Sequence, residues 1–304
     1  MAIYIREYEE GKEKEQAKKE IWKERLGKIT IWQDSHNQIV EVPSIKSKGE
    51  EKKQRKRAKK IQKKIFSKEG KEIVLSNKLL ADSILCTSLE SKKELITGRK
   101  VYPYLAIFML EELMEKRKQK MEEQKIYILV NDNTQIHIEL IQELAQKAKG
   151  IHIISNHIEK FKRLENIFLE EMGILITVSN NKRKSLAKAE WILNLDFPSE
   201  LVNRFQIYPK AILINIQEEV IIKKKSFEGI NIQGCQISYP LTEEEKKIYQ
   251  GFDLLSHYEA SKLLKGNMKV VNKKLQEDGV QIQSFIGTNG VIAEEELRDT
   301  KKSH

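Results

Sequence analysis

Residues 125–155 decide the fold class, and they read KIYILVNDNTQIHIELIQELAQKAKGIHIIS. A short apolar run at 126–130 opens the segment, and a second apolar run at 151–154 closes it. Between them, apolar residues recur at the three- and four-residue spacing of one helix face, and Gly150 ends that pattern. Strand, helix and strand in this order predict the βαβ unit of a parallel sheet.

The same pattern continues along the chain. Phe161, Leu164, Phe168 and Met172 share one helical face, and Gly173 follows them. Further apolar runs predict strands at residues 174–178, 191–195 and 211–216. We therefore predict an α/β fold, a Rossmann-like doubly wound parallel sheet with a smaller N-terminal α/β domain and a C-terminal helical segment.

Changes in composition divide the 304 residues into five parts. Residues 1–28 alternate charges at helical spacing and predict a charged helical arm. Residues 29–100 predict a small α/β domain that contains a basic helix at 48–66. A connecting helix follows at 101–124, then the Rossmann-like domain at 125–240, and finally a C-terminal helix and tail at 241–304.

Composition narrows the class of protein. The 55 basic residues are 45 Lys and 10 Arg, a bias typical of AT-rich genomes, so the formal net charge of +10 does not by itself indicate a partner. Cys86 and Cys235 lie far apart, which favours a reduced protein without disulfides. The histidines have no metal-ligand spacing, so we predict no metal site. No signal peptide and no run of about 20 apolar residues is evident, so we expect a cytoplasmic protein without a membrane span.

Positive charge is concentrated between Lys48 and Lys64, where ten Lys or Arg stand against Glu50 and Glu51, a net charge of +8. The two acids at the start favour a helix. Three interpretations are open: a solvated helix face whose Lys stems cover a sheet, a contact with an anionic surface such as RNA or lipid headgroups, or a disordered linker. The candidate residues for nucleic acid are Lys52, Lys53, Arg55, Lys56 and Arg57.

Polar residues follow the ends of four predicted strands. In open α/β sheets, ligands bind at the carboxyl ends of the strands, near the point where the strand order reverses. The same residue types also cap the helices that follow strands, so each of them has an ordinary structural explanation as well. The ligand-binding candidates at this edge are Asn131, Asp132, Thr134, Asn156, Asn180, Asn181, Lys182, Arg183 and Asp196.

Two features near this edge of the sheet have two interpretations each. Asn181 would cap a short helix whose first turn is Lys182, Arg183 and Lys184, and cations at the positive end of a helix dipole favour a bound anion unless they point into water. His137 lies on the apolar face of its helix, where it is either a core-edge histidine or a general base. No catalytic residue is assigned.

Residues 156–158 read NHI and residues 194–198 read NLDFP, each directly after a predicted strand. With the order of elements over residues 30–265, they resemble the group of shikimate dehydrogenases and glutamyl-tRNA reductases. The shikimate dehydrogenases have Asn-Arg-Thr at the first position, which reads the adenosine ribose, and an Asn-Ala-Thr-Pro loop at the second. Asn156, Asn194 and Pro198 match those motifs, and the resemblance implies a two-domain protein with an NAD(P)-binding domain.

The first βα turn departs from that group. The family has a glycine-rich loop there, which lets the backbone approach the pyrophosphate at the helix N-terminus. Residues 131–135 of this chain read NDNTQ, without glycine, and Asp132 would repel a pyrophosphate. The family's catalytic Lys and Asp have no matching motif either. We therefore predict no cofactor, NAD(P) included.

Three functions are consistent with the sequence. The leading one is a non-canonical ligand-binding or regulatory module that binds a protein partner, a second copy of itself or a small ligand. The second is a nucleotide-dependent enzyme with a cleft between the two domains, in which Asn156, Asn180, Lys182 and Arg183 hold the nucleotide. The third is a nucleic-acid-associated protein that uses the basic helix.

Overall fold

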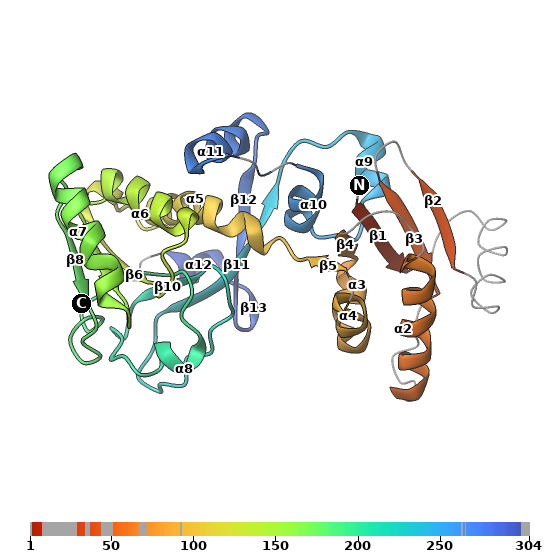
Figure 1. Ribbon diagram of the computed structural model, residues 1–304, viewed down its shortest axis with the longest axis horizontal. Coiled ribbons are helices and arrows are strands. Elements are labelled where there is room, and N and C mark those ends of the chain that lie inside the picture. Colours follow the sequence, from red (N-terminus) through yellow and green to blue (C-terminus); the bar gives the residue numbers. More distant parts are fainter. Residues whose placement is uncertain are drawn as a thin grey trace. The chain divides into compact units, whose positions relative to one another are not determined.

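A computed structural model of the chain describes residues 2–7, 29–33, 37–43, 51–66, 72–91, 93–262, 264 and 266–298, with the backbone alone at 32, 33, 66, 171 and 172. The chain forms two compact units (Figure 1). Unit 1 consists of Met1–Gly98 together with Leu241–Leu263, and unit 2 of Arg99–Pro240 together with Leu264–His304. The smaller α/β unit is thus completed by residues from the segment predicted as a C-terminal helix and tail.

The sheet of unit 2 has the strand order β13-β12-β11-β10-β9-β6-β7-β8. Its parallel strands are β6 (Lys125–Leu129), β7 (Gly150–Ile154), β8 (Ile176–Ser179), β9 (Trp191–Asn194), β10 (Ile212–Asn215) and β11 (Ile230–Ser238). From β8 to β11 this is the order of a doubly wound Rossmann sheet, and it reverses between β6 and β9. The predicted Rossmann-like α/β fold is confirmed, and the five predicted parallel strands lie within two residues of their expected bounds.

Helices cover both faces of this sheet, α5 and α6 on one side and α8 on the other (Figure 1). Leu129, Ile154 and Ile192 point to the α8 side, where they pack with Phe197 and Phe205. Because side chains alternate along a strand, the neighbouring buried residues of β6, β7 and β9 face α5 and α6. The helices of unit 2 are α5 (Tyr102–Lys116), α6 (Gln135–Lys147), α7 (Ile158–Met172), α8 (Ser199–Val202), α11 (Met268–Glu277) and α12 (Glu294–Leu297).

An antiparallel extension completes the sheet. β12 (Gln281–Gly287) pairs antiparallel with β11, and β13 (Gly290–Val291) pairs with β12. The pairing of β11 with β12 shifts register beside Gly234, where a Cβ atom would lie 2.3 Å from the hydroxyl oxygen of Tyr102. Glycine therefore lets α5, which begins at Tyr102, pack directly on β11. The residues predicted as a connecting helix at 101–124 thus contain α5, a core helix of unit 2 with nine buried residues.

The sheet of unit 1 has the strand order β2-β3-β1-β4-β5. β1 pairs in parallel with β3 and β4, β4 pairs in parallel with β5, and β2 pairs antiparallel with β3. The strands are β1 (Ala2–Glu7), β2 (Thr30–Gln33), β3 (Gln38–Val42), β4 (Glu72–Leu75) and β5 (Glu94–Ile96). This unit is therefore a second, smaller α/β fold.

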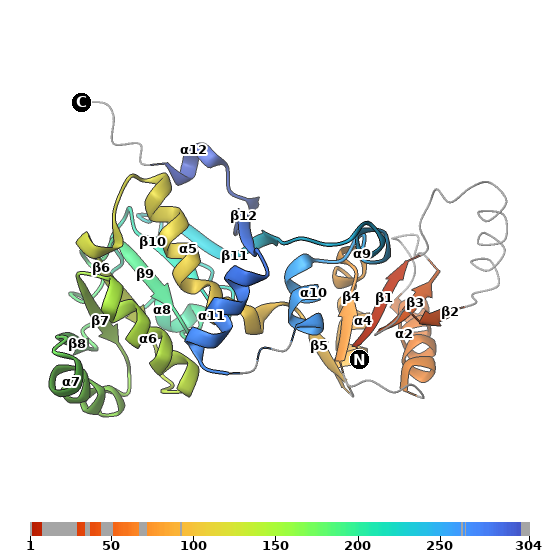
Figure 2. The same ribbon diagram turned by 90° about the horizontal axis from the view of Figure 1, so that it is seen from above.

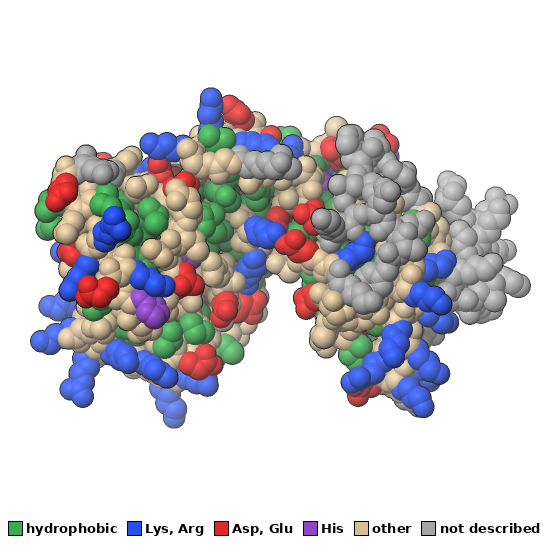
Figure 3. All heavy atoms as spheres, in the orientation of Figure 1, with side chains coloured by type: hydrophobic (Ala, Val, Ile, Leu, Met, Phe, Trp, Pro, Cys, Tyr) green, Lys and Arg blue, Asp and Glu red, His purple; other side chains and the backbone are tan. Residues whose placement is uncertain are grey.

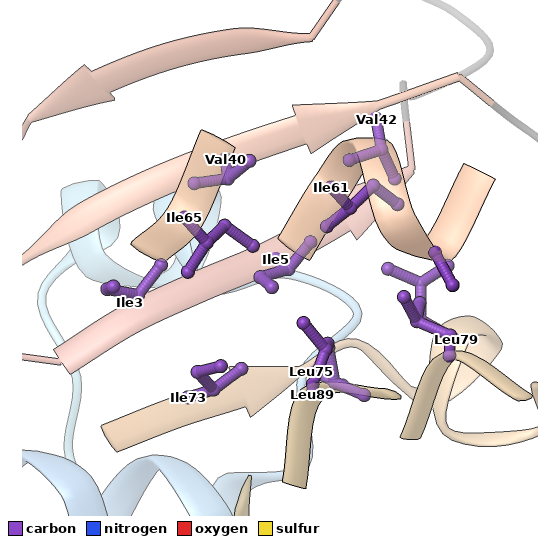
Figure 4. Close-up of a cluster of buried hydrophobic side chains, with 12 residues drawn as sticks. Ile3, Ile5, Val40, Val42, Ile61, Ile65, Ile73, Leu75, Leu79 and Leu89 are labelled. Carbon is purple, nitrogen blue, oxygen red and sulfur yellow. The ribbon is translucent and has the colours of Figure 1, made fainter. Parts of the chain in front are cut away.

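Both faces of this smaller sheet are covered. Ile61 and Ile65 of α2 (Glu51–Phe66) point toward Ile3 and Ile5 of β1 (Figure 4). The same cluster includes residues of α3 (Asn77–Leu80) and α4 (Ser83–Glu90). On the opposite face, Tyr4 packs with residues that follow α9 (Glu243–Ile248) and precede α10 (Leu254–Ser261), and Figure 2 shows α10 beside β4.

One element contradicts the sequence prediction. Residues 1–28 are predicted as a charged helical arm, but Ala2–Glu7 form β1, and the first five of these residues are buried. A strand in the middle of a sheet covered on both faces reads as a continuous apolar run, and this one is too short to outweigh the charges that follow it. Residues 8–28 lie outside the described residues. In the part of the chain that the structure describes, no helix is both long and apolar enough to cross a membrane.

Candidate functional site

The turn after β6 is closed by a carboxylate from the turn after β9. Asp196 Oδ1 accepts a hydrogen bond from the backbone amide of Asn131 at 2.7 Å, and Asp196 Oδ2 accepts one from the amide of Asp132, also at 2.7 Å. These amides lie at the reversal point of the sheet, just before α6. In dinucleotide-binding Rossmann domains, the amides of this turn and the following helix N-terminus receive the pyrophosphate. Here a side chain of the protein itself takes their hydrogen bonds.

The protonation of Asp196 reflects this half-buried position. Burial raises the pKa of the Asp196 carboxyl, and the neighbouring Asp132 adds a smaller effect in the same direction. The hydrogen bonds from the backbone of Asp132 and Asn131 lower the pKa but do not offset the burial. The net direction is upward, so the folded protein binds a proton at this site more readily than a free aspartate does.

Asn131 also connects the first turn to the second. Its side-chain oxygen accepts a hydrogen bond from the backbone amide of Asn156 at 3.0 Å, and Lys160 of α7 lies 3.5 Å from the Asp132 carboxylate. Thr134 caps α6, and its hydroxyl accepts from the amide of His137. The structure thus brings together Asn131, Asp132, Asn156 and Asp196, with Thr134 at the start of the adjoining helix.

His137 is fully buried and held at both ring nitrogens. Nδ1 lies 2.7 Å from the carbonyl oxygen of Asp132, and Nε2 lies 3.1 Å from the side-chain nitrogen of Gln217. The short Nδ1 contact to a carbonyl requires a proton on Nδ1, which leaves Nε2 as the acceptor for Gln217. Among the two interpretations of this residue, the geometry favours the core-edge histidine that orders the turn.

The third turn forms a separate basic loop. The side-chain oxygen of Asn181 accepts from the amides of Arg183 and Lys184 at 3.0 Å each, as a cap would. Residues 182–188 are turns, however, so the short helix predicted after Asn181 is wrong. The side chains of Asn180, Lys182 and Arg183 are exposed. With no helix there is no helix dipole, and the Asn181 side chain has already taken two amides that an anion would use.

A buried amide network lies behind the turn after β9, and of its members only Asn194 is singled out by the sequence. Asn194 Nδ2 donates to Asn215 Oδ1 at 3.0 Å, and Asn215 Nδ2 donates to Asn231 Oδ1 at 2.9 Å and to the carbonyl oxygen of Ile232 at 2.8 Å. Gln233 then donates to the carbonyl oxygen of Val220. The feature of the sequence that could have indicated this network is a single Asn at the end of an apolar strand, as in Ile212–Asn215. The network fixes the strand ends next to Asp196.

The predicted nucleic-acid residues of the basic helix α2 fall into two groups, exposed side chains and one that faces the sheet. Lys52, Lys53, Arg55 and Lys56 are exposed, and Arg55 pairs with Glu51 of the same helix at 2.6 Å. Arg57 instead turns toward the sheet, where it contacts the Pro43 carbonyl oxygen and lies 3.6 Å from Glu7. The apolar stripe of α2, which consists of Ala58, Ile61 and Ile65, is buried in the core of unit 1. Figure 3 shows Lys and Arg side chains gathered over this helix.

Unit 2 also has a pocket of about 400 Å³ beside α5, lined by apolar residues such as Phe108, Leu275 and Ile282 and by Glu111, Glu112 and Glu115. Two of these glutamates pair with lysines, Glu111 with Lys147 and Glu112 with Lys116. Within the described residues, no group of three His, Cys, Asp or Glu side chains is placed to hold a metal ion.

Comparisons with known proteins give little beyond the fold. No family model and no curated protein matches the chain. Among solved structures, the chain is similar to L-tryptophan dehydrogenase from Nostoc punctiforme, with 11% sequence identity and a TM-score of 0.32. The match covers 70% of this chain and 62% of that chain, so this chain matches less than two thirds of the length of the dehydrogenase. The comparison does not support a closer relation to the shikimate dehydrogenase group.

Proposed function

We propose that unit 2 is a Rossmann-like binding module that works without NAD(P) and that binds a protein partner or a small ligand at the carboxyl edge of its sheet. The observation that supports this proposal is the position of Asp196. Its two carboxylate oxygens take the amide hydrogens of Asn131 and Asp132 at the reversal point. That is where a Rossmann enzyme places the pyrophosphate of its cofactor.

Electrostatics oppose a pyrophosphate in this turn. The incoming phosphates would have to displace Asp196 from both amides, and they would meet the exposed carboxylate of Asp132. Two unit charges of the same sign 4 Å apart repel by about 4 kcal/mol at the effective dielectric constant of a protein surface, which is about three orders of magnitude in affinity. Glycines that would let the backbone move closer are absent from residues 131–135.

The rest of the edge suits a neutral polar ligand or a partner chain. Asn133, Thr134, Asn156 and Asn180 expose amide and hydroxyl groups, which both donate and accept hydrogen bonds. Such groups match the peptide groups and polar side chains of a protein surface. A nucleotide-dependent enzyme would have to rely on the exposed side chains of Lys182 and Arg183. The backbone amides that could bind a phosphate, in the turn after β6 and in the turn after β8, already donate to side chains of the protein.

Calorimetric titration with NAD, NADP and their reduced forms tests the proposal. We expect no measurable binding to the natural protein, and low-micromolar binding would contradict the proposal. The matched variant Asp196→Ala removes the competing carboxylate and leaves the amides in place. Weak cofactor binding that appears only in this variant would identify Asp196 as the cause. Sedimentation velocity on the natural protein tests whether the partner is a second copy of the chain.

The exposed cations of α2 support a second candidate function, association with nucleic acid. The helix buries Ala58, Ile61 and Ile65 in the core of unit 1, so its charged face is fixed toward solvent. An ordered row of cations is suited to phosphates spaced along a strand. Binding of fluorescent RNA and DNA duplexes at about 50 mM salt, where surface charges are least screened, tests this function.

A further inference from the structure

A groove of about 370 Å³ runs between α2 and α4 in unit 1, and its two walls differ in chemistry. Arg55 and Lys59 line it from α2, and Ser83, Thr87 and Ser88 line it from α4, with Ala58 and Ile84 also in the lining. One wall therefore supplies positive charge and the other supplies hydroxyl donors. Both are groups that proteins use to contact the phosphates of nucleic acids.

We propose that this groove seats a phosphate of a nucleic-acid backbone, bound by Lys59 and Arg55 on one side and by the hydroxyls of α4 on the other. The proposal rests on the second candidate function and names the place where a phosphate is held. Lys59 is exposed, and no ion pair or hydrogen bond joins its ammonium to a carboxylate among the residues described here. The Arg55 guanidinium donates two hydrogen bonds to the Glu51 carboxylate, and its other N–H groups remain available as donors.

The groove is built from fixed elements. Gln62 Nε2 of α2 donates to the carbonyl oxygen of Ser88 at 2.9 Å and to the hydroxyl of Ser91 at 3.3 Å, which ties the two helices together beside the groove. Ile61 and Ile65 of α2 and Leu85 and Leu89 of α4 are buried in one cluster beneath them. A phosphate would therefore meet donors whose positions are already set, which reduces the entropy lost on binding.

The carboxylates of α4 leave the middle of the groove clear. Asp82 precedes the helix and accepts a hydrogen bond from the amide of Leu85, and Glu90 is its last residue. Neither lines the groove. A phosphate between Lys59 and Thr87 would thus face cations and neutral hydroxyls.

The structure favours a nucleic acid over a lipid surface as the source of the phosphate. A membrane-bound amphipathic helix inserts its apolar face among the lipids, but the apolar face of α2 is buried in the protein. The large exposed hydrophobic side chains, such as Leu169 and Val270, all belong to unit 2 in the described residues. A duplex is the better probe than a single strand, because the described lining of the groove contains no aromatic ring for base stacking.

Fluorescence anisotropy with labelled RNA and DNA duplexes over 50 to 300 mM salt, about the range where phosphate contacts respond most, tests the groove. The groove variant Ser83→Ala/Thr87→Val/Ser88→Ala removes hydroxyls without changing charge. We expect its affinity to fall about three- to tenfold with an unchanged salt slope, because neutral donors release no counterions. The variant Lys59→Gln should lose affinity and lower the slope by about 0.9 for DNA.

Two further variants separate the groove from general charge. The ridge variant Lys52→Gln/Lys56→Gln/Lys60→Gln removes three exposed lysines of α2 that do not line the groove, and it should lower the slope by about 2.7. The control Lys184→Gln/Lys188→Gln/Lys210→Gln removes the same charge from exposed lysines of unit 2 and should bind like the natural protein. Circular dichroism melting establishes that each variant folds.

The possible results are distinct. If the ridge variant loses binding while the groove variant binds normally, the groove proposal fails and the nucleic-acid function stands. If the natural protein binds neither duplex, both fail. If it binds vesicles that contain phosphatidylserine but no duplex, the phosphate belongs to a lipid and the proposal is overturned.

Discussion

Asp196 binds the turn at Asn131 across 65 residues of sequence, and its carboxylate oxygens lie 2.7 and 3.0 Å from the Asn131 amide nitrogen. This contact lies at the point where the strand order of the sheet reverses, between β6 and β9. A negative charge is still bound at the position where the fold usually binds one, but the charge belongs to the chain. The amide hydrogens of this turn are therefore already bound by a carboxylate of the same chain.

Removing this carboxylate should destabilise unit 2. In Asp196→Ala the half-buried amide of Asn131 and the exposed amide of Asp132 lose their acceptor, at a cost of about 1 to 2 kcal/mol in total. Urea denaturation measures this change in the free energy of unfolding. An unchanged free energy would show that water replaces the carboxylate without loss.

The pH dependence of stability should carry the signature of Asp196. Its pKa in the folded protein is raised above the ordinary value of 3.8. Between the pKa of Asp196 in the unfolded chain and its higher pKa in the folded protein, the folded state binds more protons than the unfolded state. The contribution of this residue to the free energy of unfolding therefore falls as pH rises through that window, and it stays constant at higher pH. The difference in unfolding midpoint between the natural protein and Asp196→Asn, measured from pH 3.5 to 7, should show this fall, and a rise in the same range would contradict it.

His152 should act in the opposite direction. Its ring stacks on Tyr127, and its buried Nε2 atom has no hydrogen-bond partner among the described residues. Its pKa is lowered by burial and by the charge of Lys125. As pH falls, the His152 ring is protonated near pH 6.5 in the unfolded chain and only at a lower pH in the folded protein. The contribution of this residue to stability is therefore lost as pH falls below 6.5. In His152→Phe, which keeps a stacked ring, this loss should disappear, so that the variant gains on the natural protein between pH 7 and 5 in thermal unfolding.

The hydrogen bond between Tyr4 and His257 should stabilise unit 1. The Tyr4 hydroxyl lies 2.7 Å from His257 Nδ1, and both residues are buried. Tyr4→Phe leaves the histidine without this partner at a cost of about 1 to 3 kcal/mol in urea denaturation. Tyr208→Phe, at a half-buried position of unit 2, is the matched control and should change the free energy by less than about 0.5 kcal/mol.

The amide network should be sensitive to truncation. Asn215→Ala removes the acceptor of Asn194 and the donor to Asn231 and Ile232 in a fully buried position, so we expect a loss of about 3 kcal/mol or more. Asn156→Ala is the control at the same sheet edge, because the contact of Asn156 with Asn131 uses its backbone amide. Equal losses in the two variants would show that the network adds nothing.

The parallel sheet of unit 2 was predictable from sequence because each strand is a short apolar run next to a helix with a clear period. β1 was not predictable in the same way. Its partners β3 and β4 lie more than 30 residues away, and the apolar part of Ala2–Glu7 is brief beside the charged segment that follows. Local patterns report local periodicity, whereas this strand is held by distant neighbours.

The candidate site was predictable in part. The ends of the strands could be read from the sequence, since they follow from the fold, and so could the absence of glycine in the first turn. The contact of Asp196 with the first turn required the register of β6 against β9, which no local pattern encodes. The amide network and the groove beside α2 depend likewise on side chains that come from different elements. The short helix after Asn181 failed because the cap formed without a helix to follow it.

Unit 1 is built from two separate segments of the chain, which affects how it folds during translation. The ring of Tyr4 packs 4.8 Å from that of Tyr249, although the 142 residues from 99 to 240 are translated between the two. At about 5 to 20 residues per second, the nascent sheet waits roughly 7 to 30 s for the segment that covers its second face. During that interval Tyr4, Ile39 and Val74 lack their cover from Tyr249 and Phe252. Unit 1 therefore finishes folding only after the parallel strands of unit 2 have left the ribosome.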